Sequence, residues 1–137
     1  MLAIVLAFLG CRESKEEVTP ENLSGVWVEV SARADTLVLN RTAPRLAPTG
    51  NPESNTLTVN RGRAVNAGGH VVPKIGSGPY QFYIREGRIH VRSFLSSNSK
   101  FSDHAIEQRK DGLRIENFFE VGFNQPATAV RTFVRLP

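Results

Sequence analysis

Short runs in which every second residue is apolar recur along the chain, and they constrain its fold more than any other feature. A period of two is typical of a β-strand that buries one face. Turn signals separate the runs, and Glu86-Gly87 is a two-residue hairpin loop with glycine where a positive φ is needed. We therefore predict an all-β fold, an antiparallel barrel or sandwich of seven or eight strands. The predicted strands are 26–30, 36–40, 55–61, 80–85, 88–94, 103–109, 113–119 and 130–136.

The size and charge of the chain favour one ordinary domain. The 137 residues suffice for one domain with a real core. The formal net charge is +4, and the arginines are scattered along the strands rather than gathered in one segment. A nucleic-acid binder usually concentrates its basic residues on one face, so we expect no nucleic-acid partner.

The first ten residues form an uncharged apolar run that ends at Cys11, the only cysteine of the chain. The run is too short to span a bilayer as a helix and has the length of the hydrophobic region of a signal peptide. The charged residues that follow Cys11 make a poor continuation of a buried element. The alternative is that residues 2–9 form a buried strand or helix and that Cys11 is a buried thiol.

The junction at Cys11 resembles the bacterial lipobox, with Phe8, Leu9 and Gly10 before the cysteine. It departs from the usual pattern in having Phe8 rather than leucine. It also lacks a basic segment before the apolar run, which would be explained if the true start codon lay upstream. The resemblance implies cleavage after residue 10, fatty acylation of Cys11 (as with palmitate) and anchoring to the cell envelope. The expected membrane is the outer one, at its periplasmic face or at the cell surface.

The chain therefore divides into three parts: a signal peptide over 1–10, a lipidated cysteine and flexible tether over 11–22, and a β-domain over 23–137. Lys15-Glu16-Glu17 is similar to the acidic surface-export signal of lipoproteins of the Bacteroidetes group, although a solvated linker explains it equally simply. The segments 42–54 and 63–78 are rich in proline and glycine. We expect both to be long loops at one rim of the barrel, with a short strand near 70–72.

Leu23-Ser-Gly25-Val-Trp27 resembles the Gly-x-Trp opening of the lipocalin-like proteins, especially the small lipocalin-like lipoproteins of Bacteroidetes. The resemblance extends over roughly 23–137, although the chain is shorter than a full-length lipocalin and lacks its C-terminal helix. It implies an up-and-down barrel of about eight strands. It also implies that Trp27 closes one end of the barrel beneath an arginine of the last strand, Arg135 or Arg131, as a structural pair.

A barrel of eight strands either fills its interior with side chains or encloses one small ligand. Periodicity does not separate the two, because both place the same residues inside. The expected interior set is Tyr80, Phe82, Ile84, Ile89, Val91, Leu113, Ile115 and Val130. Of these, the candidate ligand-binding residues are Tyr80, Phe82, Ile84, Val91 and Ile115.

No motif in the sequence indicates catalysis, a cofactor or a metal. The three histidines, His70, His90 and His104, lack partners at metal-ligand spacing, and His90 shares the solvent-facing side of its strand with Arg92. Gly76-Ser77-Gly78 lacks the spacing and the following helix of a nucleophile elbow. Two functions remain: a non-enzymatic carrier of a small apolar ligand, or an interaction module with a packed barrel that binds another envelope protein through its loops.

Overall fold

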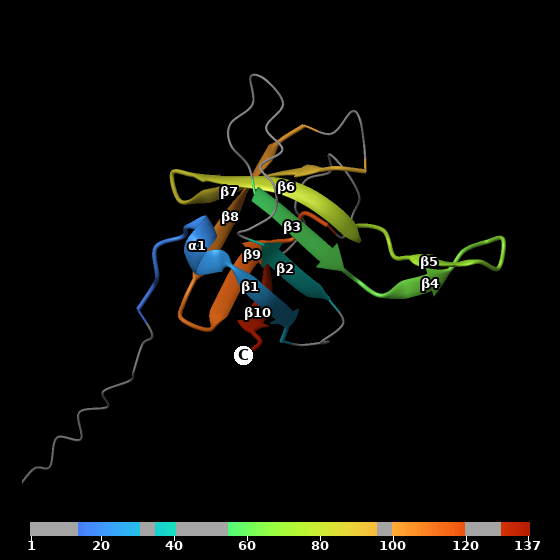
Figure 1. Cartoon of the computed structure of the whole chain (residues 1–137), viewed down its shortest axis with the longest axis horizontal. Helices are drawn as coiled ribbons and strands as arrows, with labels where there is room; N and C mark the ends of the chain where they lie inside the picture. The colour runs from blue at the N-terminus through green and yellow to red at the C-terminus, as the bar shows by residue number, and fades with distance from the viewer. Residues whose placement is uncertain (1–13, 31–34, 41–54, 96–99, 120–129) are drawn as a thin grey trace, which may run out of the picture.

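A computed structural model describes residues 14–30, 35–40, 55–95, 100–119 and 130–137 (Figure 1). In these ranges a short helix, α1 (Pro20–Leu23), precedes ten strands. Two short strands, β4 (Arg63–Val65) and β5 (Val71–Pro73), pair only with each other. The other strands are β1 (Gly25–Glu29), β2 (Thr36–Asn40), β3 (Asn55–Asn60), β6 (Gly78–Arg85), β7 (Arg88–Ser93), β8 (Ser102–Gln108), β9 (Gly112–Glu116) and β10 (Val130–Arg135).

These eight strands form a closed antiparallel barrel in the order β1-β10-β9-β8-β7-β6-β3-β2. The barrel closes where β1 pairs with β10, with Trp27 opposite Arg135. Each strand pairs with its neighbours along the chain, apart from the insertion of β4 and β5 between β3 and β6. The predicted up-and-down barrel of about eight strands is thus confirmed, and each predicted strand corresponds to one barrel strand.

The turn between β6 and β7 has the predicted geometry. Glu86 and Gly87 both have positive φ values, 53° and 70°. A two-residue loop of this kind matches the right-handed twist of the strands that it joins. It fixes the register in which Tyr83 lies opposite His90.

Among the described residues, the centre of the barrel is filled with side chains. Trp27, Leu37, Leu57, Ile89 and Phe133 have no solvent-accessible surface. A side chain that faces a cavity large enough for water keeps some accessible surface, so this central layer is packed. The remaining buried apolar side chains are Leu23, Leu39, Val59, Tyr80, Phe82, Val91, Leu113, Ile115, Phe118 and Phe119.

The prediction that Val130 faces the interior is wrong. Val130 is 51% exposed, and the inward positions of β10 are those of Arg131, Phe133 and Arg135. Both faces of this strand carry apolar residues, so alternation alone does not choose between them. The face with Arg131 and Arg135 is the inward one because both arginines have ion-pair or hydrogen-bond partners there.

From Glu16 onward the structure differs from the flexible tether predicted over 11–22. The amide of Glu16 donates to the carbonyl of Gln108 on β8 at 2.9 Å, and Leu23 is completely buried. Between them lies α1, where the Thr19 hydroxyl accepts from the amide of Asn22 and Pro20 occupies the first turn. The cap and the buried leucine outweigh the polar composition of the segment. The expected signal peptide and Cys11 lie outside the described residues.

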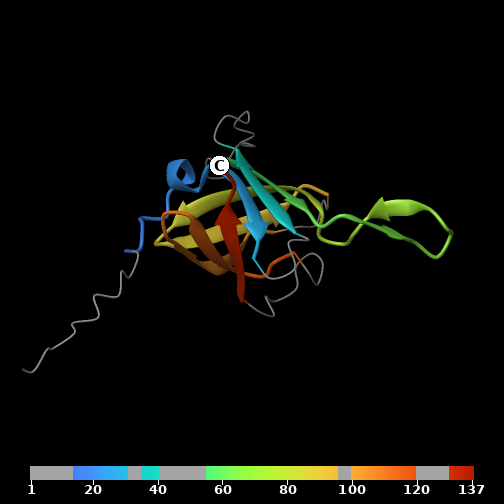
Figure 2. The ribbon, with the colours of Figure 1, turned by 90° about the horizontal axis from the view of Figure 1, so that it is seen from below.

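The segment 63–78, expected to be mostly an irregular loop, instead contains a hairpin that we call the arm (residues 63–73). Arg63 pairs with Pro73 and Val65 with Val71. At its tip the Asn66 side chain accepts hydrogen bonds from the amides of Gly68 and His70, both at 3.0 Å. The arm extends from the barrel on the side opposite to α1 in two perpendicular views (Figures 1 and 2). The other expected loop, 42–54, lies outside the described residues.

Candidate functional site

Arg135 covers Trp27 at the end of the barrel next to α1. Its guanidinium carbon lies 4.3 Å from the centre of the tryptophan ring. The two terminal nitrogens donate to the carbonyls of Ser24 and Asn22, each at 2.6 Å. The indole nitrogen of Trp27 donates to the carbonyl of Leu23 at 2.9 Å. These contacts fasten the end of α1 across this end of the barrel, which is a structural role.

Charged side chains occupy the interior further along the same strand. Arg131 contacts Glu29 at 2.6 Å and Asp35 at 3.2 Å, and both carboxylates are buried. Arg61 lies 3.5 Å from the other oxygen of Asp35. Buried carboxylates need such partners, because the desolvation of an unpaired charge is costly. The cluster therefore explains why β1 and β10 turn Glu29 and Arg131 inward.

The five candidate ligand-binding residues lie within the packed core. Phe82, Val91 and Ile115 are each at most 3% exposed, and Tyr80 is also buried. Ile84 is partly buried and packs against the core. The side chains of Tyr80 and Phe118 meet edge to face, with ring centres 5.2 Å apart. Within the described residues these side chains contact one another and not an open cavity.

The buried histidine is His104, and no motif around it distinguishes it from the other two histidines. Its Nε2 lies 2.9 Å from the hydroxyl of Ser102, and its Nδ1 lies 3.8 Å from a carboxylate oxygen of Glu116. Burial lowers the pKa of His104 below its ordinary value. His90, expected to be solvated, is half-buried and stacks on Tyr83 with ring centres 4.5 Å apart. In the described part of the chain, no cluster of three His, Cys, Asp or Glu side chains is placed to hold a metal ion.

A bend held from inside the barrel connects the arm to β6. Arg61 donates to the carbonyl of Ile75 at 2.7 Å, and the Tyr80 hydroxyl donates to the carbonyl of Gly76 at 2.7 Å. Burial raises the pKa of Tyr80 to about 12, so this hydroxyl keeps its proton. Gly76 has a φ of +90°, and a Cβ there would lie 1.6 Å from the carbonyl oxygen of Phe119. Only glycine fits this position.

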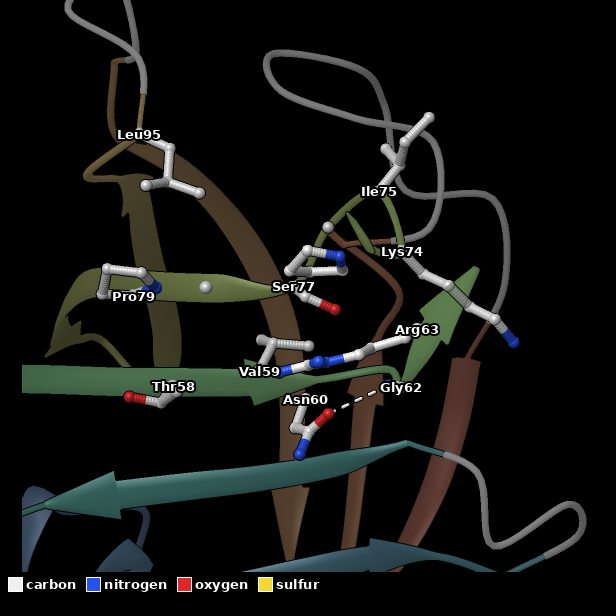
Figure 3. Close-up of a pocket in the computed structure, with 13 residues that line it drawn as sticks. Thr58, Val59, Asn60, Gly62, Arg63, Lys74, Ile75, Ser77, Pro79 and Leu95 are labelled. Carbon is white, nitrogen blue, oxygen red and sulfur yellow. Dashed lines mark hydrogen bonds between the residues drawn. The ribbon is translucent and has the colours of Figure 1, made fainter. Parts of the chain in front are cut away.

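The bend creates a groove of about 650 Å³ on the outside of the barrel, between the base of the arm and the start of β6 (Figure 3). Its walls are mostly apolar and include Ile75 and Leu95, which are 72% and 60% exposed. The Leu95 side chain lies over Gly78, where a Cβ would be only 2.7 Å away. The Arg63 side chain extends into the groove from the other side. The remaining lining residues are Thr58, Val59, Asn60, Gly62, Pro73, Lys74, Gly76, Ser77 and Pro79.

Sequence reasoning did not find this groove. The prolines and glycines of 63–78, including Pro73, Gly76 and Gly78, correctly predict an interruption of the strands, but they predict a loop rather than a hairpin. The missing signal was the pairing of 63–65 with 71–73 around the polar turn that starts at Asn66. Because of this pairing the segment forms a hairpin followed by a bend, and the groove lies on the inner side of that bend.

The fold and the groove define a class of structure: a closed up-and-down β-barrel with a packed centre and a binding-sized concavity on its outer wall. No protein-family model matches the chain, and no curated protein or solved structure is similar enough to indicate a relationship. Within the residues that the structure describes, no helix has the length and apolarity needed to cross a membrane.

Proposed function

We propose that the protein is a membrane-anchored, non-enzymatic interaction module that binds another protein of the cell envelope through the outer groove. The observation that carries the proposal is the contrast between the two candidate sites. The central side chains of the barrel have no accessible surface, whereas the groove exposes Ile75 and Leu95 beside about 650 Å³ of open volume. Exposed apolar side chains that gather around a concavity are typical of a binding site.

The rigidity of the groove supports the same proposal. The backbone of the bend is fixed by Arg61 and Tyr80, whose side chains are anchored in the barrel. The carbonyl of Ile75 is therefore held while its side chain is displayed to solvent. A site of this kind loses little conformational entropy on binding.

The envelope location rests on the sequence around Cys11. Three acyl chains on this residue would hold the protein permanently at a membrane, because each buried methylene contributes about 0.8 kcal/mol. The test is Cys11→Ser, which should abolish labelling with a fatty acid and release the protein from the membrane fraction. Membrane attachment that is unchanged in this variant would contradict the anchor.

A carrier of a small apolar ligand inside the barrel is the alternative, and it has less support. It requires space around Phe82, Val91 and Ile115, which are at most 3% exposed. Native mass spectrometry of the purified protein without detergent tests it. A bound small molecule that is lost on Phe82→Trp, but not on Ile75→Ser, would favour the carrier.

The interaction itself is tested by photo-cross-linking in cells that naturally make the protein. A photoreactive amino acid at Ile75, and separately at Leu95, should give cross-links to the same segment of one partner protein. The matched control is Arg114, an exposed residue of β9, which lies across the barrel from β3 and β6. No cross-link from either groove position, or the same partner from all three positions, would contradict the proposal.

A further inference from the structure

The charge around the groove indicates what kind of partner it accepts. From Asn55 to Arg85 the chain contains no aspartate or glutamate, although it contains Arg61, Arg63, Lys74 and Arg85. Arg61 is paired with Asp35 inside the barrel. Arg63 and Lys74, which line the groove, have no carboxylate partner within the described residues. Arg63 therefore brings a positive charge without a carboxylate partner among the described residues next to the apolar walls, while the Lys74 side chain extends from the rim of the groove away from its centre (Figure 3).

Three other arginines of the barrel are paired with carboxylates. Arg88 pairs with Asp103 at 2.8 Å, Arg109 with Glu107 at 3.1 Å, and Arg131 with two buried carboxylates. Arg63 instead extends across the groove toward Val59 (Figure 3). An arginine in this position presents a planar donor that suits a carboxylate.

The arm extends the same surface. Residues that pair across an antiparallel sheet lie on one face of it, and alternate pairs share that face. Arg63 and Pro73, which line the groove, are therefore on the same face as the next alternate pair, Val65 and Val71. These two valines are 67% and 61% exposed. The groove and this face of the arm thus form one apolar track, which we call the arm track (Arg63, Val65, Val71, Pro73, Ile75 and Leu95).

A hairpin of two three-residue strands has little stability of its own in water, and the described residues provide no third strand for the arm. The arm gains stability when its exposed face is covered. A small ligand in the groove would leave the valines uncovered, whereas an extended chain reaches along the whole arm track. The shape therefore favours a polypeptide.

The direction of the arm also favours a protein over a lipid surface as the partner of the arm track. The start of the described chain and α1 lie on the side of the barrel opposite to the arm (Figures 1 and 2). A lipid anchor at Cys11, only five residues before the contact of Glu16 with Gln108, would hold the side of α1 near the membrane. The arm would then extend away from that membrane.

We propose that the arm track binds an extended segment of a partner protein in which aspartate or glutamate is adjacent to apolar residues. The partner's carboxylates pair with Arg63 and Lys74, and its apolar side chains cover Ile75, Leu95 and the two valines. This inference rests on the proposed function and specifies the chemistry of its partner.

The test is selection from a displayed library of random 12-residue peptides against the purified full chain. The expected peptides have aspartate or glutamate next to valine, isoleucine or leucine. A synthetic peptide of the selected consensus, measured by fluorescence anisotropy, should bind at least ten-fold more weakly when its acidic residues are changed to their amides. Its affinity should also fall as salt is raised.

Two charge-reversal variants decide whether the track is the site. Arg63→Glu with Lys74→Glu should weaken the acidic peptide at least ten-fold. The matched control, Lys110→Glu with Arg114→Glu, reverses two exposed charges away from the arm and should change its affinity less than two-fold. Ile75→Ser tests the apolar wall without a change of charge and should also weaken binding. Equal unfolding midpoints establish that each variant is folded.

Several results would overturn the inference. They are a library selection with no acidic preference, an affinity that survives reversal at Arg63 and Lys74, and arm-dependent binding to phosphatidylglycerol vesicles in place of peptides. If cross-links from Ile75 and Leu95 still identify one partner segment, such a result refutes the acidic recognition alone. If those cross-links are also missing, the proposed function fails with it.

Discussion

Replacement of Arg135 tests whether one side chain holds the end of the barrel together. Its guanidinium donates to two carbonyls at 2.6 Å and lies 4.3 Å from the Trp27 ring. Arg135→Leu removes all three contacts and leaves the carbonyl of Ser24 without this donor. The carbonyl of Asn22 retains the hydrogen bond from Gln108, so its loss is smaller.

The expected cost follows from these contacts. A hydrogen bond from a charged donor contributes about 1.5–3 kcal/mol, and a cation–π contact contributes about 0.5–2 kcal/mol. Because such contributions are not additive and Arg135 is partly exposed, we expect a loss of about 3–4 kcal/mol. Arg135→Lys keeps the charge over the ring but reaches only one carbonyl, so it should lose about half as much.

The assay is urea unfolding of the purified full chain, followed by tryptophan fluorescence. Trp27 is the only tryptophan, so the signal reports on this end of the barrel. With an m-value of about 2 kcal/mol/M, Arg135→Leu should lower the midpoint by roughly 1.5–2 M and Arg135→Lys by roughly 1 M. A urea midpoint for Arg135→Leu that lies within about 0.3 M of the parent midpoint would refute the reasoning for any m-value in the usual range of ~1–3 kcal/mol/M.

Three further substitutions test the bend, the charged cluster and the buried histidine. Gly76→Ala should lower the free energy of unfolding by about 3 kcal/mol or more. The control is Gly62→Ala, where φ is positive but the space is open, and it should cost about 1 kcal/mol. Equal urea midpoints for the two variants would contradict this. Arg131→Met removes the arginine that contacts the buried carboxylates of Glu29 and Asp35, although Arg61 still lies beside Asp35. It should cost about 3–5 kcal/mol, and a loss below ~1 kcal/mol would show that the cluster is dispensable. Burial lowers the folded-state pKa of His104 below its unfolded value, so this group stabilises the fold at pH above about 6.5 and loses that contribution as the pH falls. His104→Gln should therefore flatten the fall in stability between roughly pH 7.5 and 5.5, and an unchanged pH dependence would contradict this reasoning.

The barrel was predictable because period-two alternation and turn residues agree along most of the chain. The Glu86-Gly87 turn and the strands beside it have the predicted limits to within two residues. The order of the strands follows from the short connections between them. The resemblance to lipocalin-like proteins also pointed to the contact of Trp27 with Arg135 that the structure contains.

The errors have a common physical origin. Alternation shows which residues of a strand share a face but not which of the two faces is buried. In β10 the inward face contains two arginines. Their inward orientation depends on partners distant in the sequence, which are Glu29 and Asp35 for Arg131 and the carbonyls of Asn22 and Ser24 for Arg135. The groove was missed for the same reason, since it exists only where Arg61 and Tyr80 hold a bend formed by residues distant from them in the sequence.

We propose that the space available for binding lies outside the barrel and not within it. Xenon enters apolar cavities, so methyl NMR spectra recorded under xenon pressure report directly where such space exists. We predict xenon-dependent shifts for the methyl groups of Ile75 and Leu95 and none for those of Leu37, Leu57 and Leu113. Shifts concentrated on the three inward leucines would show a hollow barrel and contradict the account.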